Sequence, residues 1–113
     1  MEATGFRAYP GRMTPVLVAE DCELEGTVGQ LVTLRLPENA TTGYLWTIAE
    51  AGSGLQQEDE RTVVDPAAAP GAAGAHEFDV RIRQPGRWRV VLRLGRSWEG
   101  AATQERRVIL AVR

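Results

Sequence analysis

Apolar and polar side chains alternate with a period of two through most of this 113-residue chain. Successive side chains of a β-strand point to opposite faces, so this period predicts half-buried strands and not helices. The clearest runs are residues 32–36, 44–48, 78–82, 88–94 and 108–112, with weaker candidates at 15–20 and 62–65. About seven strands, separated by breaks rich in Gly and Pro, are typical of an all-β sandwich.

The segments between these runs set the expected domain organisation. Residues 51–60 are polar and contain two glycines, and residues 66–74 consist of Ala, Gly and Pro, so both are predicted to be connections. A chain of this length is large enough for one ordinary hydrophobic core. We therefore expect a loosely ordered N-terminal arm over residues 1–14 and a single domain over residues 15–113.

Residues 84–86 form a three-residue break between two runs of similar length, 76–83 and 87–94. A break this short predicts a β-hairpin. The segments that enter and leave such a hairpin emerge side by side, at the end about 25 Å from the turn.

The same pairing sets Arg83 opposite Arg87 and Arg81 opposite Arg89, which could form an anion or RNA site. No aromatic residues share that face, and acidic residues lie nearby in the sequence. We interpret the arginines as a solvated sheet face.

Composition excludes several partners. The formal net charge of −2 gives no field that attracts nucleic acid or anionic lipid, and no apolar run approaches the roughly 20 residues that span a bilayer. Cys22 is the only cysteine, so no intramolecular disulfide forms. Residues 1–13 lack the apolar stretch of a secretory signal. We expect a monomer that is cytoplasmic unless a leader has been removed.

Catalytic and metal-binding groups are scarce. Cys22 and His76 could form a nucleophile–base dyad, but an edge thiol and a histidine at the start of a strand are simpler readings. One His and one Cys are too few ligands for a metal site, and the acidic run at residues 58–60 is interpreted as a solvated loop. The sequence predicts no enzyme, no metal and no cofactor.

Three segments are not explained by the needs of folding. The first predicted loop places small hydroxyl residues and a glycine at a turn: Asn39, Ala40, Thr41, Thr42, Gly43 and Tyr44. The second offers bare backbone that could pair with another chain: Gly71, Ala72, Ala73 and Gly74. The third exposes residue types that are common in binding hot spots: Arg96, Ser97 and Trp98.

In this order and spacing, the three loops resemble those of the chagasin family, which inhibits papain-like cysteine proteases. The first family loop typically reads Asn-Pro-Thr-Thr-Gly-aromatic, with a Trp two positions later, as Trp46 is here. The second is Gly-rich before a strand with a Phe, as at Phe78, and the third reads Arg-Pro-Trp. The resemblance covers about residues 24–112. Ala40 and Ser97 stand where the family has Pro, which loosens both loops.

The resemblance implies an immunoglobulin-like β-sandwich whose three loops form a wedge in the protease cleft. By analogy, Thr41 and Thr42 lie over the catalytic Cys–His pair, residues 71–74 run along the non-primed subsites, and Trp98 packs on the primed side. The expected function is reversible, competitive inhibition without a covalent bond. The alternative is an immunoglobulin-like interaction module that binds a non-protease partner through the same loops.

Overall fold

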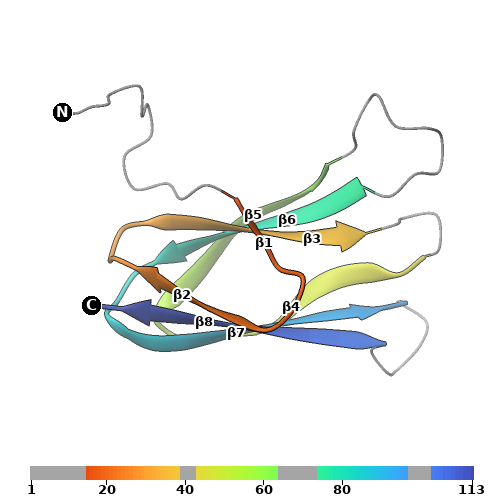
Figure 1. The fold of residues 1–113 in the computed structure, drawn as a ribbon. Helices are drawn as coiled ribbons and strands as arrows, with labels where there is room; N and C mark the ends of the chain where they lie inside the picture. Colours follow the sequence, from red (N-terminus) through yellow and green to blue (C-terminus); the bar gives the residue numbers. More distant parts are fainter. Residues whose placement is uncertain (1–14, 39–42, 64–73, 97–102) are drawn as a thin grey trace.

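The computed structural model describes residues 15–38, 43–63, 74–96 and 103–113, so the predicted arm at residues 1–14 lies outside the described residues. Within these ranges, eight β-strands form two four-stranded sheets that lie face to face (Figure 1). The predicted all-β sandwich is confirmed. Across the described ranges, no helix is long and apolar enough to cross a membrane.

Each sheet mixes parallel and antiparallel pairs. The first sheet has the order β1-β3-β6-β5, formed by Val16–Leu17, Leu31–Glu38, Gly74–Ile82 and Leu55–Val63. The second has the order β2-β8-β7-β4, formed by Cys22–Gly26, Gln104–Val112, Gly86–Gly95 and Leu45–Ala51. The pairs β1–β3 and β2–β8 are parallel and the others antiparallel. Strand β2 is the strand that the sequence-based prediction lacks.

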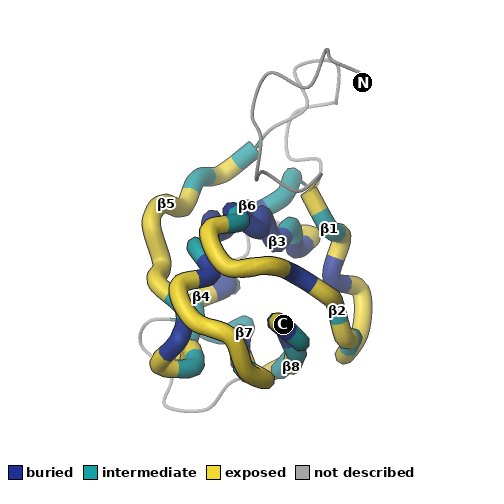
Figure 2. Tube along the Cα trace, turned by 90° about the vertical axis from the view of Figure 1, so that its left-hand side faces the viewer, coloured by how far each residue is buried: buried dark blue, intermediate teal, exposed yellow. Residues whose placement is uncertain are grey.

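The core lies between the two sheets. Alternate residues of β3, β6, β7 and β8 point inward, and the tube in Figure 2 is mostly dark blue along β3 and β6. The buried core comprises Val18, Val32, Leu34, Leu36, Trp46, Phe78, Ile82, Val90, Leu92, Val108, Leu110 and Val112. The period of two in the sequence therefore predicted the inward face of these strands correctly.

The predicted hairpin at residues 84–86 is wrong. Strand β6 lies between β3 and β5 in one sheet, whereas β7 lies between β8 and β4 in the other. The connection crosses from sheet to sheet, and the amides of Arg83 and Gln84 donate to the carbonyl of Gly54 at 2.8 and 3.2 Å. A short break is compatible with a hairpin within one sheet and with a crossing between two sheets. The inward faces of the two strands are apolar in either case.

The predicted connection at residues 51–60 is also wrong, because β4 continues to Ala51 and β5 begins at Leu55. Strand β5 is an edge strand, most of it exposed (Figure 2). Its acidic residues 58–60 are therefore part of a strand and not of a solvated loop. A strand with one solvated face and one open edge carries mostly polar residues, which hides it from a search for apolar alternation.

The predicted pairing of arginine with arginine does not occur, because β6 and β7 are not neighbours. Arg81 donates to Glu58 at 3.0 and 3.1 Å, and Arg87 donates to Glu23 at 2.8 and 3.0 Å. These hydrogen bonds lower the pKa of Glu58 and the pKa of Glu23 below their ordinary values. Arg81 and Arg87 therefore each have an acidic partner in place of another arginine.

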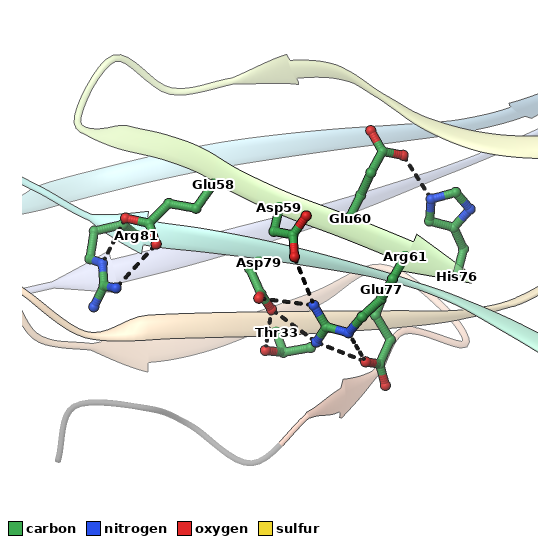
Figure 3. Close-up of polar contacts among 9 residues, drawn as sticks. All are labelled: Thr33, Glu58, Asp59, Glu60, Arg61, His76, Glu77, Asp79 and Arg81. Carbon is green, nitrogen blue, oxygen red and sulfur yellow. Dashed lines mark hydrogen bonds and ion pairs between the residues drawn. The ribbon is translucent and has the colours of Figure 1, made fainter. Parts of the chain in front are cut away.

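A second polar cluster covers the outer face of the first sheet, where Glu77 and Asp79 of β6 are buried (Figure 3). Arg61 of β5 donates to Glu77 at 2.9 Å and to Asp79 at 3.0 Å, and the Thr33 hydroxyl donates to Asp79 at 2.6 Å. Hydrogen bonding to Asp79 raises the pKa of Arg61. Buried carboxylates need such donors, so this cluster ties β3, β6 and β5 together.

Glycines make room for Trp88 at the end of the sandwich where β4 turns into β5. A methyl group at Gly54 would overlap the indole ring of Trp88. We expect Gly54→Ala to lower the free energy of unfolding by about 1–3 kcal/mol, because the indole must shift. Urea unfolding measures the change. Ser53→Ala, at an exposed neighbour in the same turn, should change it by less than about 0.5 kcal/mol. Equal effects of both substitutions would contradict this packing.

Candidate functional site

The described strand ends on either side of residues 39–42, 64–73 and 97–102 lie at one end of the sandwich (Figure 1). The residues that flank these segments are Glu38 and Gly43, Val63 and Gly74, and Arg96 and Thr103. Glu38 pairs with Gly74 across β3 and β6, and Leu45 pairs with Gly95 across β4 and β7. The second and third loops are not brought side by side by a hairpin as predicted. Their described ends at Gly74 and Gly95 belong to different sheets and lie at the same end of the sandwich (Figure 1).

Gly43, Tyr44, Gly74 and Arg96 are the predicted site residues that the structure describes. Asn39, Ala40, Thr41, Thr42, Gly71, Ala72, Ala73, Ser97 and Trp98 lie outside the described residues. Their part in binding stays a prediction. The described residues show how the ends of the three loops are held.

A contact between aromatic ring and guanidinium links the first loop to the third. The guanidinium carbon of Arg96 lies 4.1 Å from the ring centre of half-buried Tyr44. Such a cation–π contact contributes on the order of 0.5–1 kcal/mol. Gly43 has a φ of 81°, which glycine adopts without the steric cost of a Cβ. The turn into β4 therefore requires glycine at this position, and it presents Tyr44 to Arg96.

Trp46 closes the base of the first loop. Its buried indole donates from Nε1 to the carbonyl of Pro37 at 2.9 Å, and its backbone amide donates to the Glu38 carboxylate at 2.8 Å. Pro37 and Glu38 end β3, whereas Trp46 is the second residue of β4 in the other sheet. These two hydrogen bonds hold together the strands on either side of the first loop.

Glu38 also contacts the strand that follows the second loop. Its two carboxylate oxygens lie 3.2 and 3.1 Å from Nδ1 of His76. Nε2 of His76 lies 2.8 Å from Glu60 of β5, and Figure 3 shows this second contact. Sequence reasoning missed this group, because Glu38 and His76 are 38 residues apart and neither belongs to a known motif. Their positions in the sequence could have drawn attention to them, because Glu38 directly precedes the first loop and His76 follows the second.

The dyad of Cys22 and His76 does not form. Cys22 is in β2 and His76 in β6, in different sheets, and both ring nitrogens of His76 face glutamates. Burial, and then the charges of Asp21 and Glu20, raise the pKa of the Cys22 thiol, which keeps it protonated and weakly nucleophilic. Within the described ranges, His, Cys, Asp and Glu side chains form no group of three or more that could hold a metal ion.

Comparison of the sequence with known proteins agrees with the resemblance of the loops. Residues 26–112 match the family described as "Chagasin family peptidase inhibitor I42". The chain is also 32% identical over 85 residues to chagasin from Trypanosoma cruzi, covering 71% of this chain and 77% of that protein.

Solved structures share the fold. The crystal structure of a cysteine protease inhibitor from Entamoeba histolytica has a TM-score of 0.74 and 18% identity, covering 88% of this chain and 96% of that one. The solution structure of amebosin has a TM-score of 0.73 and 21% identity, covering 93% and 100%. The structure of PbICP-C in complex with falcipain-2 has a TM-score of 0.64 and 13% identity, covering 89% of this chain and 100% of that one. The expected immunoglobulin-like sandwich is confirmed.

The indole hydrogen bond of Trp46 can be tested by substitution. We expect Trp46→Phe to lower the free energy of unfolding by about 1–3 kcal/mol, because it removes the donor to the Pro37 carbonyl and leaves a gap in the core. Trp88→Phe removes a matching bond of 2.9 Å to the carbonyl of Gln84, but an exposed one that water can replace. Urea unfolding should therefore show the smaller loss for Trp88→Phe, and the reverse order would contradict the role of Trp46.

Proposed function

The chain belongs to the chagasin family of peptidase inhibitors, and we propose that it inhibits papain-like cysteine proteases reversibly, by filling the active-site cleft with its three loops. The protein is an inhibitor and not an enzyme. The observation that carries the proposal is the gathering of the three loop ends at one end of the sandwich, together with the family match over residues 26–112. A solved relative in complex with falcipain-2 supports a cysteine protease as the partner.

Each loop has a proposed place in the cleft. Thr41 and Thr42 are small enough to lie over the catalytic Cys–His pair, where they exclude substrate. Residues 71–74 offer backbone N–H and C=O groups that pair in β fashion with the non-primed subsites. Trp98 packs on the primed side as an apolar anchor. Because no bond forms between inhibitor and enzyme, inhibition is reversible and competes with substrate.

Loops that are held in place before binding favour such a mechanism. Association loses translational freedom and orders side chains, so loops held in advance leave more of the contact energy for affinity. An interface of standard size buries roughly 1,600 Å², which is enough for tight binding when the loops are preorganised. The contacts of Trp46 with Pro37 and Glu38, and of Arg96 with Tyr44, support such preorganisation. Ala40 and Ser97, which replace the family's prolines, act against it.

Titration against papain tests the proposal directly. We expect micromolar or lower concentrations of the protein to abolish papain activity, with a degree of inhibition that falls as substrate concentration rises. Trypsin, a serine protease, serves as the control and should stay active. Unchanged papain activity at micromolar inhibitor would contradict the proposal and favour an immunoglobulin-like module with a non-protease partner.

A charge added to the first loop tests where the protease binds. We expect Thr42→Arg to weaken inhibition of papain by tenfold or more, about 1.4 kcal/mol, because a bulky cation would stand over the catalytic pair. Ser53→Arg adds the same charge to an exposed turn at the other end of the sandwich and should leave inhibition unchanged. Both variants should keep the melting temperature of the unaltered protein within about 2 °C. A large drop for Thr42→Arg alone would make its loop structural.

A further inference from the structure

Glu38 is a buried carboxylate at the end of β3, with 1% of its side chain exposed. Burying a carboxylate costs free energy unless donors replace the lost water. Glu38 has two polar partners: the backbone amide of Trp46 donates to it at 2.8 Å, and Nδ1 of His76 lies 3.1 Å away. A residue so costly to bury and so fully partnered constrains the chain around it.

His76 connects Glu38 to a second carboxylate. Its side chain is 11% exposed, its ring stacks on Phe78 with centroids 4.5 Å apart, and its Nε2 lies 2.8 Å from Glu60. Each ring nitrogen of His76 thus contacts a glutamate, and the side chain links β3 to β5 from its place on β6 between them.

These contacts occur where four strands meet the first two loops. Glu38 is the last residue of β3 and Trp46 the second of β4, so they stand on either side of the first loop. Glu60 and His76 stand on β5 and β6 on either side of the second. One connected set of hydrogen bonds thus spans the bases of both loops.

We propose that Glu38, His76 and Glu60 are positioning residues, which set how the first loop stands relative to the second when the inhibitor meets a protease. This inference rests on the proposed function, because it assigns these residues a part in the affinity that the loops provide. They lie beneath the loops in strands and act through the backbone of Trp46 and of the strand ends. If the strand ends beneath the two loops adopt the correct arrangement in only a fraction of the molecules, the apparent affinity for the protease is reduced to that fraction of its full value.

A purely stabilising role can be separated from a positioning role, because the same strands carry a second buried polar contact. The Thr33 hydroxyl donates to Asp79 at 2.6 Å, also between β3 and β6. Thr33 pairs with Asp79 in the register and Leu36 with His76, so the two contacts are three residues apart, roughly 10 Å along the strands. Loss of the Thr33 contact should lower stability without disturbing the loop bases.

The experiment compares Glu38→Gln, His76→Gln, the double variant and Thr33→Val, each titrated against papain and each unfolded in urea. Glu38→Gln keeps an oxygen that can accept from Trp46 but replaces the other carboxylate oxygen near His76 with an amide nitrogen. We expect each single variant to weaken inhibition about tenfold or more. Because Glu38 and His76 act as a unit, the double variant should inhibit papain within about twofold of the less inhibitory single variant. Thr33→Val should lower stability yet keep inhibition within about twofold of the unaltered protein.

Amide hydrogen exchange gives a second readout that needs no protease. The Trp46 amide should exchange at least tenfold faster in Glu38→Gln and in His76→Gln, relative to its rate in Thr33→Val. If one of the single variants does not fold, the other decides by the same two measurements.

Two results would overturn the inference. Variants at Glu38 and His76 that inhibit papain as well as the unaltered protein, or no worse than Thr33→Val of equal stability, would leave these residues a structural role only. If the unaltered protein itself fails to inhibit papain, the proposed function fails and takes this inference with it, so the two failures are distinguishable.

Discussion

Apolar contact between the two sheets is the interaction on which the rest of this molecule depends. Phe78 and Leu34 of one sheet and Leu92 and Leu110 of the other are fully buried. Burying side chains of this size contributes about 1.5–3 kcal/mol each, and no disulfide supplements it. This packing fixes the distance between the sheets and so the spacing of every loop that crosses from one to the other.

Polar contacts at the edges of that core hold particular strands together. On the outer face of the first sheet, Arg61 satisfies two buried carboxylates of β6 and so fastens the exposed strand β5. At the loop end, Glu38 and His76 are partnered in the same manner, but there the contacts join the strands on either side of two loops. A buried charge tolerates few arrangements, so it specifies geometry where apolar packing alone tolerates several. For an inhibitor that works by presenting loops, such geometry bears directly on function.

Much of the fold was predictable from the sequence, because alternation records which side chains face the core. The strands around Leu34, Trp46, Phe78, Leu92 and Leu110 were all predicted, and so was their sandwich. Local alternation did not reveal the exposed edge strand β5, and it does not say which strands are neighbours. Strand β5 and the crossing at residues 84–86 are defined by hydrogen bonds to distant strands, and a backbone partner leaves little trace in local sequence. The loop motifs indicated the family, whereas Glu38 and His76, whose roles come from each other, had no motif.

The sequence by itself determined the strand faces, the family and the three loops that the proposed function uses. Only the tertiary structure decided which strands are neighbours, which acid meets which arginine, and that Glu38, Trp46, His76 and Glu60 meet beneath the first two loops. The division follows from the range of the interactions. Alternation and turn chemistry act between residues close in sequence, whereas a buried carboxylate is satisfied by whatever donors the folded chain brings to it from dozens of residues away.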